Sequence, residues 1–133
     1  MNIVQANTIS PVIRKLLSFA TSDKKVQQEY EKYILLSNRT LYSFEVEDEI
    51  VGCIGIEKIN LSECKLKHIA VLVDQRGKGI GSEMINFIAC KYSSIVAETD
   101  NEAVDFYQRY GFFITSLGEK YPGVERFLCQ YNK

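Results

Sequence analysis

The stretch from Lys67 to Gly81, KHIAVLVDQRGKGIG, decides the fold of this chain. Its first half carries an apolar run, Ile69 to Val73, that is typical of a buried strand. Its second half places Gly77, Gly79 and Gly81 in a turn, and the residues that follow continue at helical spacing. Amides in the first turn of a helix have no intrahelical partner and carry partial positive charge. Glycines at such a helix start predict a cradle for a phosphate or pyrophosphate.

Several families of glycine loop share this design, so their spacings must be compared. The P-loop pattern fails because the Gly77-Lys78 pair is followed by glycine instead of serine or threonine. The dinucleotide pattern G-x-G-x-x-G matches at Gly77 and Gly79, but Ser82 stands at its third position. Asp100 does lie roughly twenty residues further on, where a ribose-binding acid is expected. Dinucleotide binding therefore stays open as an alternative at this point.

Length and composition predict one soluble domain, residues 1–133. The 16 basic and 17 acidic residues leave a net charge of −1, which gives no electrostatic case for nucleic-acid binding. No apolar stretch is long enough to span a membrane, and the N-terminal residues lack the charged-then-apolar pattern of a secretory signal, so we expect a cytoplasmic protein. The four scattered cysteines are expected to be free thiols, and with a single histidine they predict no metal site.

Hydrophobic periodicity predicts the order of helices and strands along the chain. Ser10-Pro11 is a helix start, because serine caps and proline suits the first helical position. Gly52 and Gly55 fall inside a strand pattern, where glycine indicates a bulge or a close neighbour. The expected elements are an edge strand at 2–6, helices after Ser10 and after Thr21-Ser22-Asp23, strands at 41–47, 50–59 and 65–73, a helix from Gly79, a strand at 94–99, a helix at 101–110 capped by Gly111, and strands at 112–117 and 124–130, joined by the loop 118–123.

The strand 65–73, the helix after it and the strand 94–99 form a βαβ unit, so these two strands should be parallel. The strands before the unit should form an antiparallel meander. The fold class predicted is α/β (α+β, mixed): a central, mostly antiparallel sheet with one βαβ unit and helices on both faces. A meander and a single βαβ unit also disfavour the dinucleotide alternative.

A second segment, Asn101 to Phe112, reads NEAVDFYQRYGF. Its pattern, Asn-x-x-Ala-x-x-Phe-Tyr followed by Gly-Phe, resembles one signature of the GNAT N-acetyltransferase superfamily. The arrangement Arg76-x-x-Gly79-x-Gly81 after an apolar strand resembles the other signature, the acyl-CoA pyrophosphate loop. Both signatures stand in the family's order, and the order of helices and strands matches over nearly the whole chain.

The resemblance implies acetyl-CoA as the cofactor and assigns roles by position. Tyr107 would be the catalytic acid toward the departing thiolate. Arg76 would offer its amide, with its side chain in solvent. The cofactor-binding residues implied are Arg76, Gly77, Lys78, Gly79, Ile80 and Gly81 for the pyrophosphate, and Val71, Val73 and Asn101 for the pantetheine arm.

The reaction implied is direct attack of a primary amine on the thioester, with no acyl-enzyme. Candidates for the general base are Glu57, Glu63 and His68, and water alone is an equal alternative. The acceptor would be a small molecule, a peptide N-terminus or a lysine, and Tyr30 and Tyr33 lie on a helix that should border its site. The sequence leaves the oligomeric state open between a monomer and a homodimer. A non-catalytic acyl-CoA-binding module is the alternative function.

Overall fold

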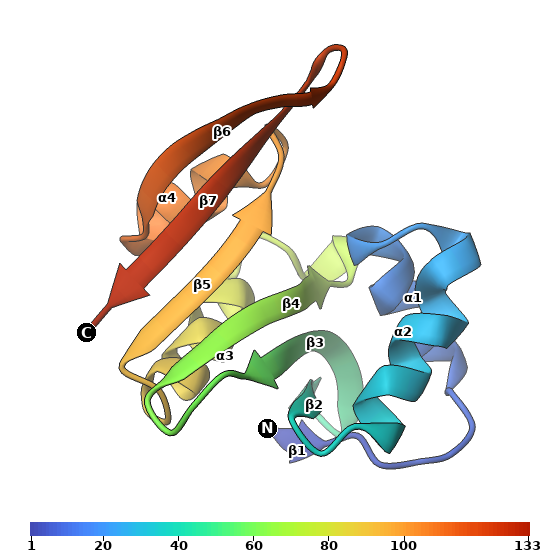
Figure 1. Ribbon diagram of the computed structural model, residues 1–133. Helices are drawn as coiled ribbons and strands as arrows, with labels where there is room; N and C mark the ends of the chain where they lie inside the picture. Colours follow the sequence, from blue (N-terminus) through green and yellow to red (C-terminus); the bar gives the residue numbers. More distant parts are fainter.

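The computed structural model describes all residues, 1–133, and combines helices with one mixed sheet (Figure 1). A seven-stranded sheet has the order β1-β2-β3-β4-β5-β7-β6. The helices α1 and α2 cover one face, and α3 and α4 cover the other. The strands are β1 (Asn2–Ile3), β2 (Arg39–Val46), β3 (Glu49–Lys58), β4 (Glu63–Val71), β5 (Ser94–Thr99), β6 (Phe113–Tyr121) and β7 (Val124–Asn132), and the helices are α1 (Pro11–Ala20), α2 (Asp23–Leu35), α3 (Ile80–Ala89) and α4 (Val104–Tyr110), with a 3-10 turn at Val73–Gln75.

The predicted fold class is confirmed. Strands β2, β3 and β4 form an antiparallel meander, and β4 pairs with β5 in parallel across α3. Helix α1 begins as expected, with the Ser10 hydroxyl accepting a hydrogen bond from the Ile13 amide at 3.3 Å. Gly111 ends α4 with a φ of 121°, the left-handed side that glycine adopts most easily. No helix reaches the length and apolarity that crossing a membrane requires.

Several predicted boundaries are wrong. The strand expected to reach Val73 ends at Val71, because the chain turns into the 3-10 segment and Val73 is 63% exposed. The edge strand expected at 2–6 pairs only at Asn2 and Ile3. The loop expected at 118–123 is mostly strand, since β6 continues to Tyr121 and pairs with β7 through its bulges. Local patterns miss such ends because distant partners set them.

Helix α4 also starts later than predicted. The segment 101–103 forms a turn in which the Asp100 carboxylate accepts a hydrogen bond from the Glu102 amide at 3.0 Å. The Asp100 carbonyl accepts from the Val104 amide at 3.1 Å, so the helical bonding begins there. Asn101 is exposed in this turn and does not cap the helix.

A β-bulge in β4 decides which side chains face which helices. His68 pairs with Gly55 and Leu66 pairs with Ile56, so the register shifts by one residue at Lys67. Before the bulge, Leu66 packs in the core beneath α3, whereas Ala70 after it packs in the core beneath α1. The bulge thus reverses the alternation of side chains along β4 and turns His68 toward α2.

Both glycines of β3 have close neighbours, as their place in the strand predicts. A Cβ on Gly55 would lie 2.0 Å from the Tyr33 hydroxyl oxygen and 2.3 Å from its Cζ. A Cβ on Gly52 would meet the Ala70 carbonyl oxygen and the Met84 methyl, each at 3.2 Å. Helix α2 can therefore approach β3 this closely only over Gly55.

We expect Gly55→Ala to lower the free energy of unfolding by about 1–3 kcal/mol, because the added methyl must displace the buried ring of Tyr33. Gly52→Ala is the matched control on the same strand, and its cost should be smaller because its neighbours need move only slightly. Urea denaturation measures both variants. Equal stability of the Gly55→Ala variant and the parent would contradict the close approach of Tyr33.

Candidate active site

The glycine loop lies at the start of α3. Gly77 and Gly79 have φ values of 79° and 80°, in the left-handed region that only glycine enters freely. An added Cβ would meet nothing within 4 Å at either residue, so the space in front of them is open. Gly79 precedes α3 and provides no side chain to cap it. The first amides of the helix therefore remain available to an anion.

Gly81 is a glycine for a different reason. Its φ is not in the left-handed region, so its backbone conformation suits any residue. An added Cβ, however, would lie 2.9 Å from Cε1 and 3.0 Å from Cζ of Phe106. The third glycine of the loop thus permits α3 and α4 to approach each other.

A cleft of about 670 Å³ opens beside this loop. Strands β4 and β5 pair only from Glu63↔Ser94 to Lys65↔Val96 and diverge beyond that point (Figure 1). The walls come from the end of β4, the glycine loop, α4 and Phe19 of α1. Of the residues implied by the signatures, the cleft is lined by Val71, Arg76, Gly77, Gly79, Ile80, Gly81 and Tyr107.

The other three implied residues do not line the cleft. Val73 lies in the exposed 3-10 turn, and Asn101 lies in the turn before α4. The Lys78 ammonium donates a hydrogen bond at 3.2 Å to the side chain of Gln75, a residue that does line the cleft. Their proposed contacts with a cofactor therefore have no support from the shape of the cleft.

Arg76 is exposed, and its side chain also contacts protein groups. Its Nε donates a hydrogen bond to the Val71 carbonyl at 3.0 Å, and its guanidinium lies 5.0 Å from the ring centre of Phe19. The side chain thus ties the loop to the last residue of β4 and reaches across to α1. Both partners line the cleft, so Arg76 forms part of its wall.

Tyr107 is buried in the wall formed by α4, with 4% of its surface exposed. Its ring packs against Phe106 and Phe112, at centroid distances of 5.3 and 5.2 Å. Burial, with a smaller contribution from the Cys129 thiol, raises the pKa of Tyr107 above its ordinary value. The phenol therefore keeps its proton at neutral pH.

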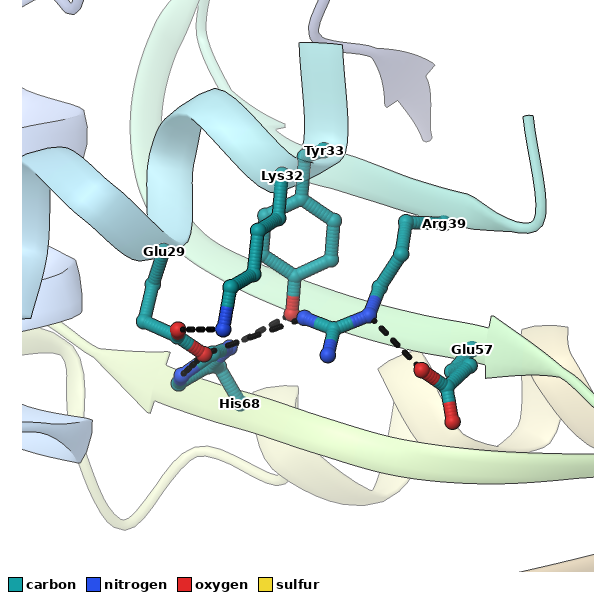
Figure 2. A network of polar contacts seen from close by, with 6 residues as sticks. All are labelled: Glu29, Lys32, Tyr33, Arg39, Glu57 and His68. Carbon is teal, nitrogen blue, oxygen red and sulfur yellow. Dashed lines mark hydrogen bonds and ion pairs between the residues drawn. The ribbon is translucent and has the colours of Figure 1, made fainter. Parts of the chain in front are cut away.

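A cluster of polar side chains lies on the other face of the sheet, beneath α2 (Figure 2). The Tyr33 hydroxyl and the His68 Nδ1 share a hydrogen bond. The His68 Nε2 lies 3.6 Å from a Glu29 carboxylate oxygen, and an Arg39 nitrogen lies 3.7 Å from the same oxygen. Arg39 in turn donates to Glu57 at 3.1 Å. We call this set, with Lys32 paired to Glu29 at 2.8 Å, the α2–β4 network.

The network was not predicted from the sequence, because its members are scattered over α2, β2, β3 and β4. Gly55 was the one local signal, since it is the residue over which the Tyr33 hydroxyl lies. Burial lowers the pKa of His68 to about 4, and only the Glu29 carboxylate opposes this shift strongly. Burial works to raise the pKa of Glu29, but Lys32, His68 and Arg39 lower it overall.

These contacts bear on the candidates for a general base. His68 is neutral and 6% exposed, and both of its ring nitrogens face protein groups. Glu57 is paired with Arg39. Glu63 opens β4 opposite Ser94, at the end where the two strands are still paired. None of the three lines the cleft, whereas Glu102, which the sequence did not suggest, does. Of the alternatives expected from the sequence, water is the one that these contacts leave free.

The four cysteines are free thiols, as predicted. Burial raises the pKa of Cys53 and of Cys64 to about 12, and Cys129 is also buried with a raised pKa. Cys90, just after α3, is exposed. None of them lines the cleft, so the site contains no thiolate nucleophile.

Comparison with known proteins points to one family. The model of the GNAT acetyltransferase domain matches residues 37–113, which is more than half of the chain. An uncharacterized N-acetyltransferase in the lysA 3′ region of Bacillus methanolicus is 36% identical over 73 residues, covering 53% of this chain and 61% of that protein. The match thus spans less than two thirds of the relative's length.

Solved structures share the fold across the whole chain. A GNAT family acetyltransferase from Elizabethkingia anophelis with acetyl-CoA bound has a TM-score of 0.75 at 24% identity, covering 99% of this chain and 96% of that one. An aminoglycoside 6′-N-acetyltransferase complexed with coenzyme A has a TM-score of 0.78 at 17% identity, covering 99% and 97%. A Bacillus subtilis acetyltransferase in complex with CoA has a TM-score of 0.71 at 18% identity, covering 99% and 98%.

The α2–β4 network makes stability depend on pH in a defined direction. The pKa of His68 is about 4 in the folded chain and about 6.5 in the unfolded one, so between these values the unfolded state binds more protons. The contribution of neutral, buried His68 to the free energy of unfolding is fully present above pH 6.5 and is lost as the pH falls toward 4. The loss should reach about 3 kcal/mol, since each pKa unit corresponds to about 1.4 kcal/mol.

We expect His68→Asn to remove this dependence, because asparagine does not titrate and its carbonyl can accept from Tyr33 in place of Nδ1. The stability difference between parent and variant should therefore shrink as the pH is lowered from 7 to 4. Urea denaturation at several pH values measures it. A difference that stays constant with pH would contradict the lowered pKa.

Proposed function

The chain belongs to the GNAT acetyltransferase family, and from that premise we propose that it transfers an acetyl group from acetyl-CoA to a primary amine. The observation that carries the proposal is the cleft itself. It joins an anion-binding helix start at Gly79 to a buried, protonated phenol at Tyr107. These are the two groups that a coenzyme A thioester needs at its pyrophosphate and at its sulfur, which the pantetheine arm separates.

The residues present fit such a cofactor. The loop from Gly77 to Gly81 would hold the pyrophosphate on its amides, because Gly77 and Gly79 leave open space where a Cβ would otherwise stand. The Arg76 amide, also expected to take part, instead donates to the Val73 carbonyl at 3.4 Å. Val71, the last residue of β4, would meet the pantetheine arm with its backbone, although its carbonyl already accepts a hydrogen bond from Arg76. Val73, Lys78 and Asn101 remain proposed contacts from the family resemblance alone. When bound, acetyl-CoA supplies an activated acyl group.

The remaining chemistry is assigned to this chain's own residues. Tyr107, which lines the cleft, would donate its phenolic proton to the departing sulfur. Burial keeps the phenol protonated at neutral pH but also makes it a weaker acid, so the transfer depends on its position beside the sulfur. The amine would attack directly, without an acyl-enzyme, and no cysteine lines the cleft to form a thioester intermediate. Water would take the proton of the amine, because His68 and Glu57 are engaged in the α2–β4 network. The acceptor would enter from the α1–α2 face, opposite α3 and α4.

We expect Tyr107→Phe to fold and to bind acetyl-CoA nearly normally while kcat falls by at least about tenfold, because a positioned acid typically contributes about 10²–10⁴-fold and water can replace part of that. The change keeps the ring and its packing against Phe112. Melting temperature, acetyl-CoA affinity and kcat are measured on the one variant. A stable variant with parental kcat would refute the acid role, and a parent that binds acetyl-CoA but acetylates no amine would favour the non-catalytic alternative.

We expect Gly79→Asp to raise the dissociation constant of acetyl-CoA at least about tenfold, equivalent to about 1.4 kcal/mol, by adding a negative charge beside the pyrophosphate. Gly118→Asp is the matched control. Gly118 has nearly the same φ, 78°, the same open surroundings, and no place in the cleft. Calorimetry should show weakened binding only in the Gly79 variant. Equal affinities in the two variants would refute the loop as the pyrophosphate site.

A further inference from the structure

Phe106 connects the two functional ends of the cleft. Its ring lies over Gly81, the second residue of α3, so closely that a Cβ there would stand 2.9 Å from Cε1. The same ring packs edge-on against Tyr107, with centroids 5.3 Å apart and an interplanar angle of 71°. Phe106 also lines the cleft. One side chain thus touches both the anion-binding helix start and the proposed acid.

Tyr107 is also packed against a second phenylalanine, so that its ring has aromatic neighbours in both Phe106 and Phe112. Phe112 contacts Tyr107 with centroids 5.2 Å apart, and Phe112 is itself buried at 4% exposure. A displacement of Phe106 therefore reaches Tyr107, because close-packed interiors transmit strain. The backbone of Gly81 does not require glycine, so the residue at this position is dictated by Phe106.

We propose that Phe106 is a positioning residue, seated on Gly81, that sets the distance between the anion-binding amides of α3 and the hydroxyl of Tyr107. The proposal rests on the proposed function, in which those two groups meet the pyrophosphate and the sulfur of one molecule. The covalent length of that molecule is fixed, so the protein must match it. A misplacement of about 1 Å can cost up to about 100-fold in rate.

The test combines Gly81→Ala with Phe106→Leu. Leucine lacks the Cε1 and Cζ atoms that the new methyl would meet. We expect each single change to lower kcat at least about fivefold, the first by pushing the ring and the second by leaving Tyr107 poorly supported. The double variant should have a higher kcat than either single one. If Gly81 is glycine only to let the pyrophosphate approach, Phe106→Leu will not rescue Gly81→Ala, and the proposal is overturned.

Whether Phe106 acts on kcat through Tyr107 is tested in a second background, the Tyr107→Phe variant. In the Tyr107→Phe variant, Gly81→Ala and Phe106→Leu should no longer lower kcat, because the hydroxyl they displace is gone. Their effects on acetyl-CoA affinity should remain as in the parent. Undiminished losses of kcat in this background would overturn the positioning role. Should Gly81→Ala fail to fold by thermal melting, Phe106→Leu in the two backgrounds makes the same comparison.

The outcomes separate this proposal from the proposed function. If the Tyr107→Phe variant keeps the parental kcat, Tyr107 is not the general acid, and Phe106 cannot act by positioning it. A low kcat in Tyr107→Phe, together with independent losses from the Phe106 changes, upholds the acid and refutes the positioning role alone.

Discussion

Strands β4 and β5 hydrogen-bond to each other over only three residue pairs, from Glu63↔Ser94 to Lys65↔Val96. Beyond this point they diverge, and the sheet is open along its middle while β3 and β7 hold the two strands from outside. The cleft exists because of this divergence, since the backbone at the end of β4 is left without a strand partner on one side. The position of every proposed site residue follows from where the divergence begins.

The bulge at Lys67 falls where the divergence begins. It turns His68 away from the apolar core beneath α3 and toward α2, where Tyr33, Glu29 and Arg39 surround it. Without the bulge, a histidine would face that apolar core without a hydrogen-bond partner, which is costly. The α2–β4 network therefore stabilises a strand that has lost one neighbour, and it fastens α2 to the same strand that bounds the cleft.

The features predicted well from the sequence are those that depend on neighbours in the chain. The βαβ unit, the loop at Gly77 and Gly79, and the end of α4 at Gly111 all follow from short-range spacing and backbone preference. The predictions fail where a distant partner decides. Val73 leaves the sheet because of the turn that follows, and α2 meets β4 through residues separated by more than thirty positions. The separate reason for Gly81 was hidden because Phe106 lies on another helix.

The distribution of the four thiols has a practical consequence for any assay of this chain. Release of coenzyme A is often followed with reagents that react with free sulfhydryls, and such reagents act on thiolates at accessible surfaces. Cys53, Cys64 and Cys129 are buried with raised pKa values, so the folded chain presents one accessible equivalent, Cys90. That equivalent sets the background of the measurement. It also offers a single attachment point for a spectroscopic label at the end of α3, the helix whose other end begins at the glycine loop.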